Sequence, residues 1–244
     1  MNLILLEPDE AAPAAVALTD HRARHLIDVL AVTPGQTVRL GIVDGPLGTG
    51  TVVGVGDRRV DLQCVFDAAA PAPPPIDLLL ALPRPKVMRR LWAQLAALGV
   101  RHVVLANAER VERNYFDTHV LQPDVYRPLL VEGLQQARDT RLPIVSIHRR
   151  FRVLIEDHLD AIAGDALRVM ADPGATARVD ETIRRHAAAR VLVAVGPEGG
   201  WNDFERRLLT AHDFHAVGMG ARTLRTDTAC VALLALINDA LAAH

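Results

Sequence analysis

The eleven residues VGPEGGWNDFE, from Val195 to Glu205, combine a glycine turn, a carboxylate and a helix start. An apolar run over 190–195 leads into the turn, and glycine there permits positive φ and a close approach of the backbone to a ligand. Asn202 is expected to cap the next helix, with Glu205 completing a capping box. This order of strand, glycine turn and helix predicts a ligand-binding loop.

Glu198, in the middle of that turn, limits the chemistry of the ligand. The glycine spacing matches neither GxGxxG nor a P-loop, whose Lys-Ser/Thr pair is absent. A carboxylate repels phosphate at close range. We therefore expect a ligand with a flat base, ribose hydroxyls and a positive centre. Two roles for Glu198 fit the sequence: favouring positive charge, or bonding backbone amides to hold the turn.

A second candidate loop lies in VGMGARTLRTDTACVALLALI, residues 217–237, where a short strand again runs into glycine. Arg222 and Arg225 stand three residues apart in this loop. Thr226 is expected to cap the following helix, and Asp227 suits its electropositive first turn. The rest of the helix is apolar, which predicts burial or an interface.

The segments that must position both loops follow residue 75. Runs that are apolar on both faces alternate with helical stretches, which predicts a parallel sheet covered by helices and a ligand at the carboxyl ends of its strands. Met88 and Trp92 are expected in the core. The predicted strands are 76–82, 102–108, 143–148, 167–172, 190–196 and 214–220, and the predicted helices are 87–99 and 124–138.

The residues before 70 follow a different pattern. A helix is expected over 20–32, and strand-like runs at 37–45, 50–57 and 59–66 follow at hairpin spacing, which predicts a small, mostly antiparallel barrel. The proline-rich stretch 66–77 is typical of a semi-rigid linker. We therefore expect two domains, 1–70 and 76–244.

Composition narrows the functional classes. The 244 residues are 50% apolar with a formal net charge of −2, which does not indicate a nucleic-acid binder. The cluster RPKVMRR, from Arg84 to Arg90, is the best basic patch, although a solvated first helical turn explains it equally well. Cys64 and Cys230 are expected to be reduced, and no metal site is expected. No signal peptide or membrane span is predicted, which favours a soluble, cytoplasmic protein with no membrane partner.

GPEGGWNDFE and MGARTLRTDTA resemble the paired C-terminal motifs of the bacterial 16S ribosomal RNA uridine-N3 methyltransferase family, in the SPOUT class. ALPRPKVMRRLWAQLAALGV is similar to the first strand and helix of that family's catalytic domain. HLIDVLAVTPGQTVRLGIVDG resembles its N-terminal barrel, so the resemblance covers essentially the whole chain.

The resemblance implies an α/β fold: a C-terminal SPOUT trefoil-knot methyltransferase domain with a small N-terminal PUA-like, RNA-binding β-barrel. It also implies a homodimer, with S-adenosyl-L-methionine as cofactor, held in the knot largely by backbone groups. The stretch ADPGA after the run 167–172 is expected to form a further wall of this site. The implied cofactor-binding residues are Gly196, Glu198, Gly199, Gly200, Met219, Leu224, Thr226 and Ala229.

The implied substrate is 16S rRNA of the small ribosomal subunit, methylated at uridine N3. A cation near a uracil carbonyl would stabilise the deprotonated base, and Arg225 is the first candidate, Arg222 the second. Asp227 stands where the family usually has Glu, so two other interpretations remain: another rRNA or tRNA position, or a non-catalytic RNA-binding protein. RNA would be bound by Arg84, Lys86, Arg89 and Arg90.

Overall fold

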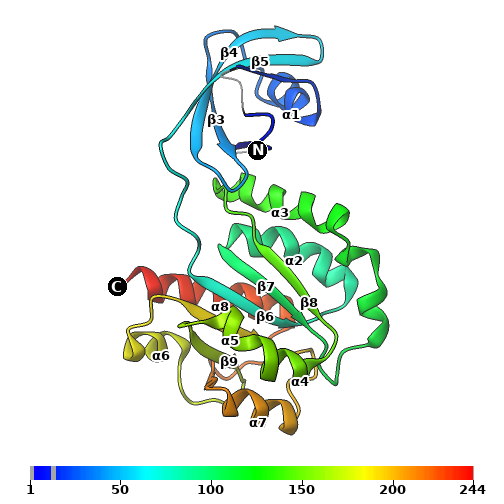
Figure 1. Cartoon of the computed structure of the whole chain (residues 1–244), viewed down its shortest axis with the longest axis vertical. Helices are drawn as coiled ribbons and strands as arrows, with labels where there is room; N and C mark the ends of the chain where they lie inside the picture. The colour runs from blue at the N-terminus through cyan, green and yellow to red at the C-terminus, as the bar shows by residue number, and fades with distance from the viewer. Residues whose placement is uncertain (1–2, 12–14, 244) are drawn as a thin grey trace. The chain divides into compact units, whose positions relative to one another are not determined.

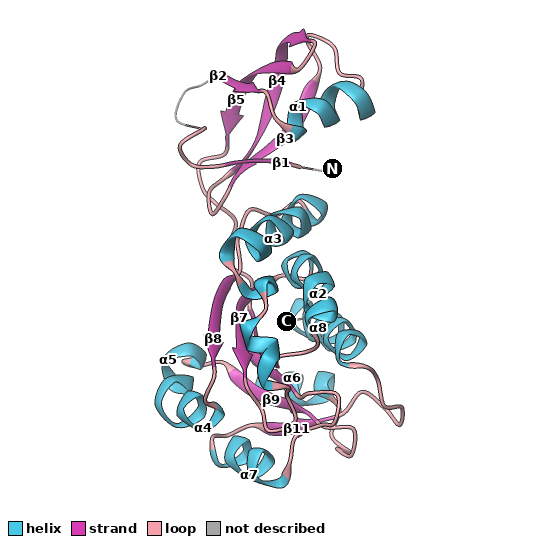
Figure 2. Cartoon of the chain, turned by 90° about the vertical axis from the view of Figure 1, so that its right-hand side faces the viewer, coloured by secondary structure: helices cyan, strands magenta, loops and turns pink. Residues whose placement is uncertain are grey.

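A computed structural model describes residues 3–11 and 15–243 of the chain. It separates into two compact units (Figures 1 and 2). The first comprises Met1–Pro73 together with Val131–Leu142, and the second comprises Pro74–Leu130 and Pro143–His244. Each unit has its own sheet, and they are described separately.

The first unit contains a five-stranded sheet in the order β1-β3-β4-β5-β2. Only the β1–β3 pair is parallel, so the mostly antiparallel prediction is confirmed. Within the described residues no strand pairing joins β1 to β2. The predicted barrel is therefore present only in part, as an open sheet. The strands are β1 (Ile4–Leu6), β2 (Ala15–Leu18), β3 (Thr37–Ile42), β4 (Leu47–Gly56) and β5 (Arg59–Phe66).

The helix expected over 20–32 is present but shorter. It begins as α1 (His21–Arg24), capped by the Asp20 side chain, and continues as a π-helical turn over His25–Val29. Leu26 on this helix is buried with Leu6, Leu40 and Leu62 of the sheet. The core of the first unit is therefore one layer of aliphatic side chains between helix and sheet.

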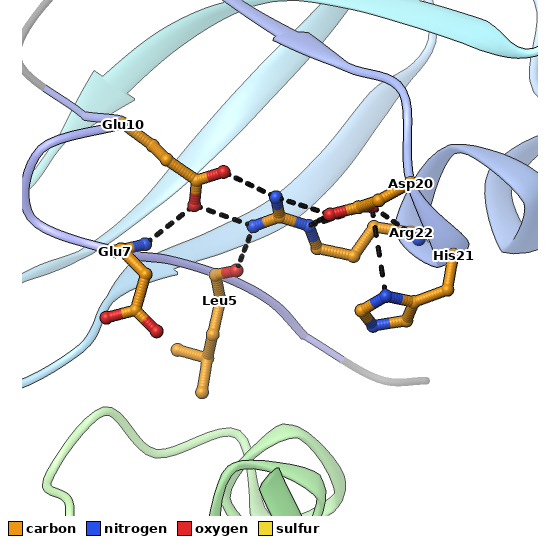
Figure 3. A network of polar contacts seen from close by, with 6 residues as sticks. All are labelled: Leu5, Glu7, Glu10, Asp20, His21 and Arg22. Atoms are coloured by element: carbon orange, nitrogen blue, oxygen red, sulfur yellow. Dashed lines mark hydrogen bonds and ion pairs between the residues drawn. The ribbon is translucent and has the colours of Figure 1, made fainter. Parts of the chain in front are cut away.

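Arg22 connects three segments of this unit (Figure 3). Its guanidinium donates to the Leu5 carbonyl at 2.8 Å, to the Glu10 carboxylate, and to Asp20 at 3.0 Å. The Arg22 side chain is only 11% exposed. Hydrogen bonding from Arg22 lowers the pKa of the Glu10 carboxyl, and in Asp20 bonds from Arg22 outweigh the opposing effect of burial and lower the pKa as well. A buried cation is thus satisfied by two carboxylates and one backbone oxygen.

The second unit contains a six-stranded sheet, in which every pair is parallel, in the order β11-β9-β10-β6-β7-β8. All six strands predicted from apolar runs are present within a few residues of their expected ends. They are β6 (Ile76–Ala81), β7 (Val100–Ala106), β8 (Ile144–His148), β9 (Leu167–Ala171), β10 (Val191–Val195) and β11 (His215–Val217).

Helices cover both faces of this sheet, as the α/β prediction requires. Figures 1 and 2 show α2 and α8 on one face and α4 and α5 on the other. Met88 and Trp92 of α2 are fully buried, as expected. The helices of this unit are α2 (Pro85–Ala97), α4 (Phe151–Val153), α5 (Leu159–Ala163), α6 (Val179–His186), α7 (Asp203–Ala211) and α8 (Thr226–Ala242). A further helix, α3 (Pro123–Ala137), begins in this unit, and its residues from Val131 onward belong to the first unit.

Both cysteines are buried and unpaired, as predicted. Burial raises the pKa of the Cys230 thiol to about 12, so this group stays protonated and unreactive at neutral pH. None of the helices in the described ranges combines the length and apolar character needed to span a bilayer.

Replacing Arg22 by Met should destabilise the first unit by about 2 kcal/mol, because hydrogen bonds to charged groups are lost. Since the folded pKa values of Glu10 and Asp20 are lowered, the stabilisation should be complete above the unfolded carboxyl pKa values, about 4. The difference between wild type and variant should shrink as pH falls through the folded pKa values.

Amide hydrogen exchange of β3–β5 measures this effect, because both tryptophans, Trp92 and Trp201, lie in the second unit. Arg59→Met is a matched control, since Arg59 forms an exposed pair with Asp61 and exposed pairs contribute little. Equal losses in the two variants would contradict the structural role of Arg22.

Candidate functional site

A cavity of about 420 Å³ lies at the carboxyl ends of β9 and β10. Three stretches of chain form its walls: residues 171–174 after β9, residues 195–201 after β10, and residues 223–229 before and within α8. The two candidate loops and the ADPGA stretch therefore meet in one place. Because parallel neighbours end at the same edge of a sheet, this is where an α/β fold binds ligands.

The glycine turn after β10 is built on a buried tryptophan. Trp201 is 3% exposed, and a Cβ added at Gly196 would lie 3.2 Å from its indole ring. The Trp201 ring also packs on Phe151, with centroids 5.4 Å apart. Gly200 has a φ of +71°, and its N–H donates to the Pro197 carbonyl at 2.8 Å. Glycine is thus needed at 196 for close packing and at 200 for backbone conformation.

The start of α7 fixes the other end of this turn. Asn202 and Glu205 form the predicted capping box, with the Asn202 side chain accepting from the Glu205 N–H at 2.8 Å. The Glu205 carboxylate is 2% exposed and accepts from the N–H groups of Asn202, at 2.9 Å, and Glu109, at 2.7 Å. One buried carboxylate therefore joins the turn to the segment after β7.

Arg110 holds the same turn from outside, a contact that the sequence did not suggest. Its guanidinium donates to the Gly199 carbonyl and, at 3.5 Å, to the Gly200 carbonyl. A Cβ added at Gly199 would lie 2.9 Å from Cδ of Arg110. Arg110 stands 89 residues before Gly199, so no local pattern could have paired them.

The wall after β9 is held by Asp172. One of its carboxylate oxygens accepts from the Gly174 N–H at 2.9 Å, and the other pairs with Arg206 of α7. The loop before α8 passes close by, since a Cβ added at Gly218 would lie 2.7 Å from the Ala175 carbonyl oxygen. Asp172 thus ties the wall after β9 to α7, and the backbone at Gly218 packs closely against the same wall.

A second cavity, of about 330 Å³, adjoins the first. Glu198 and Thr226 line both cavities. The second cavity is otherwise lined by Arg84, Val87, Arg90, Arg225 and Asp227. Its walls carry much more charge than those of the first cavity.

Some charged side chains of the second cavity are paired with one another and others are not. Arg90 donates to the Asp227 carboxylate at 3.0 Å. Burial alone would raise the pKa of Asp227, but hydrogen bonds from the Thr228 N–H and from Arg90 outweigh it and lower the pKa. Arg84 and Arg225 are exposed and have no ion pair with any described residue. Two arginines are therefore free to meet a ligand.

Most of the predicted binding residues line these cavities. Gly196, Glu198, Gly199, Gly200, Leu224, Thr226 and Ala229 line the first. Arg84, Arg90 and Arg225 line the second.

Four predicted residues line neither cavity: Arg222, Met219, Lys86 and Arg89. The α2 spacing explains the last two, because Val87 and Arg90 lie one helical turn apart on the cavity side, whereas Lys86 and Arg89 point elsewhere.

The prediction that Thr226 caps α8 is wrong by one residue. The N-cap is Arg225, whose side chain makes no capping hydrogen bond, and Thr226 is the first helical residue and buried. Asp227 does lie in the electropositive first turn, as expected. No group of three or more potential metal-binding side chains is found in the described ranges.

The family model of the RNA methyltransferase domain matches residues 70–238, well over half of the chain. The chain belongs to the RNA methyltransferase domain family. The match spans the six-stranded sheet and every residue that lines the two cavities.

The sequence of this RNA methyltransferase is similar to those of curated relatives over nearly their full length. Ribosomal RNA small subunit methyltransferase E from Treponema pallidum is 29% identical, with 97% of this chain and 90% of the relative aligned. The enzyme named Ribosomal RNA small subunit methyltransferase E 1 from Borreliella burgdorferi is 23% identical over 95% of each chain.

A solved structure supports the fold. The crystal structure of a ribosomal RNA small subunit methyltransferase E from Neisseria gonorrhoeae, bound to S-adenosyl methionine, superposes with a TM-score of 0.78. The two chains are 22% identical, and the match covers 98% of this chain and 97% of the other.

In this RNA methyltransferase, Glu205→Gln should destabilise the second unit by about 1–3 kcal/mol, because an amide group would face at least one of the two buried N–H donors. Asp203→Asn is the matched control, since Asp203 is exposed in the same turn. Urea unfolding followed by tryptophan fluorescence reports the change. A Glu205→Gln variant as stable as the control would show that the carboxylate does not hold the turn.

Proposed function

We propose that this protein is an S-adenosyl-L-methionine-dependent methyltransferase that methylates N3 of a uridine in 16S rRNA. The single observation that carries the proposal is the pair of adjoining cavities, one lined by four glycines and one lined by three arginines, with Glu198 and Thr226 in common. The names of the relatives, which are ribosomal RNA small subunit methyltransferases, support the substrate class.

The first cavity fits the cofactor in size and chemistry. Its volume of about 420 Å³ falls in the usual range of small-molecule sites, roughly 300–1,000 Å³. Gly199 and Gly200 leave the backbone accessible, and the buried Nε1 of Trp201 has no hydrogen-bond partner among the described residues. The one arginine in its wall, Arg206, is paired with Asp172, so phosphate is not favoured. A cofactor with sulfonium and ammonium groups suits this wall.

In the second cavity the protein side chains would orient and activate the base. The bound cofactor would supply an electrophilic methyl group at the boundary of the two cavities. Arg225, exposed and without a described ion pair, would place its charge near a uracil carbonyl oxygen and stabilise the deprotonated base. Arg84 and Arg90 would bind the RNA, and the shared boundary would favour in-line placement of N3, methyl and sulfur.

Finer features of the fold belong to the same proposal. We assign 1–70 as a PUA-like, RNA-binding domain and 76–244 as the SPOUT methyltransferase domain. A C-terminal trefoil knot is supported by the tight passage of Gly218 against Ala175 and by its N–H bond to the Ala177 carbonyl. Such knots are rare.

A homodimer is supported by a partly exposed strip of small and apolar side chains on α8, formed by Thr228, Val231, Ala232 and Ala235. With an rRNA substrate, the protein would act in the bacterial cytoplasm.

Two measurements test the function. Mapping of methylated nucleosides in 16S rRNA from a deletion strain should show loss of N3-methyluridine, and its return when the gene is restored. Calorimetry should show binding of S-adenosylmethionine. Persistent N3-methyluridine in a strain with no paralogue would refute the substrate, and no binding at millimolar cofactor would refute the enzyme.

Gly199→Val should weaken S-adenosylmethionine binding at least tenfold. The new side chain would displace the Arg110 side chain, so that the carbonyl groups of the turn lose the donor that holds them, and its bulk would cover the exposed backbone at Gly199. Gly56→Val is the control, because the nearest atom to a Cβ there is 3.9 Å away, in the first unit. Calorimetry measures both variants, and unchanged affinity in Gly199→Val would mean that the cofactor does not approach this turn.

Arg225→Ala should lower turnover about 100-fold, as does loss of other groups that stabilise an oxyanion, with little change in cofactor affinity. Arg222→Ala is the matched comparison and should lower turnover less, because Arg222 lines neither cavity. Single-turnover methyl transfer and calorimetry separate the two effects. If Arg225→Ala weakened cofactor binding as much as turnover, Arg225 would be a binding residue instead.

A further inference from the structure

Glu198 is the only carboxylate in the described chain that lines both cavities. It lies in the middle of the glycine turn after β10, and its side chain is exposed. Any group passing from a ligand in the first cavity to a ligand in the second must cross the boundary that Glu198 and Thr226 form.

The Glu198 carboxylate is not used to hold the turn. Within the described residues it has no hydrogen bond or ion pair. The turn is closed instead by the backbone bond from Gly200 to Pro197 and by Arg110 on the Gly199 carbonyl. The carboxylate is therefore free to accept a proton or a hydrogen bond from a ligand.

The other carboxylates of the two cavities are already occupied. Asp227 is bound by Arg90 and by the Thr228 N–H, which favour its charged form and make it a weaker proton acceptor. Asp172 is bound by Arg206 and by the Gly174 N–H, and it lines only the first cavity. Glu198 is the remaining candidate.

We propose that the second cavity holds the uracil base, and that Glu198 is a catalytic residue that accepts the N3 proton. This inference rests on the proposed function. The N3–H bond breaks and its proton passes to a Glu198 Oε atom. The N3 electron pair forms the new bond to the methyl carbon, and the electrons of the methyl–sulfur bond stay on sulfur. The proton then leaves Glu198 to water.

The same contact selects the base. Uracil presents an N3–H donor to the carboxylate, whereas cytosine presents an N3 lone pair, which a carboxylate repels. Arg84 and Arg225, which have no described ion pair, supply positive charge for the uracil carbonyl oxygens as N3 loses its proton. Glu198 and the two arginines would thus form a site matched to the imide edge of uracil.

Glu198→Gln tests the proposal, because glutamine keeps the shape and a hydrogen-bond acceptor but cannot take up the proton. Single-turnover methyl transfer to small ribosomal subunits, at saturating S-adenosylmethionine, should fall about 100-fold or more at pH 7. The melting temperature should stay within error of the wild type, and any loss of cofactor affinity from removing the charge should be much smaller than the loss of rate. Asp203→Asn, an exposed carboxylate-to-amide change outside both cavities, should leave the rate unchanged.

The pH profile separates proton acceptance from a structural role. The wild-type rate should be level between pH 7 and 8.5, whereas the Glu198→Gln rate should rise about tenfold per pH unit, because N3 must then ionise without help. A variant rate within threefold of the wild type, a profile parallel to it, or an equal loss of cofactor affinity would overturn the role of Glu198. No transfer by the wild type would instead refute the proposed function, and the inference with it.

Discussion

Parallel pairing of β9, β10 and β6 is the constraint on which the site depends. Neighbouring parallel strands end at one edge, so the segments that leave them must meet there, however far apart they lie in the sequence. Residues 171–174 and 195–201 follow β9 and β10, and Arg84 follows β6. Hydrophobic burial of the strands therefore brings the polar groups of these loops together. Only local contacts are then needed to fix the conformation of each loop.

That holding is done by buried groups. The Trp201 indole fills the space beneath Gly196, and the Glu205 carboxylate satisfies two backbone N–H donors at the start of α7. A buried carboxylate is stable only when such donors are present. The turn thus obtains a fixed shape without using Glu198, and a rigid support of this kind is what a binding site requires.

The sequence predicted the features that depend on local chemistry. Continuous apolar runs identified all six strands of the parallel sheet, because strands covered on both faces have no polar side, and the capping box identified the start of α7. Convergence of the two glycine-containing loops was implied by the resemblance, which assigns residues of both loops to one cofactor site. Thr226 was misplaced as a cap because a helix boundary depends on backbone angles that adjacent Thr and Arg residues do not determine.

Contacts between distant segments could not be read from the sequence. Arg110 has no local pattern that connects it to Gly199, and an exposed arginine in a loop is unremarkable by itself. Arg222 and Arg89 have the same residue type as Arg225 and Arg90, which line the second cavity, yet they line neither cavity. Whether such a residue faces a cavity depends on the conformation of the loop or on the orientation of α2 about its axis. The helical periodicity of the sequence shows which α2 residues share a face, but it shows which face lines the cavity only once the helix is placed against its sheet.

The charge balance explains why a carboxylate stands in this glycine turn. The first cavity has Asp172 and Glu198 against Arg206, two negative groups against one positive. The second has Arg84, Arg90 and Arg225 against Glu198 and Asp227, three positive groups against two negative. A cationic ligand is therefore favoured on one side of Glu198 and an anionic one on the other. A reaction in which an electron-rich base attacks a positively charged donor needs this difference in sign across a short distance.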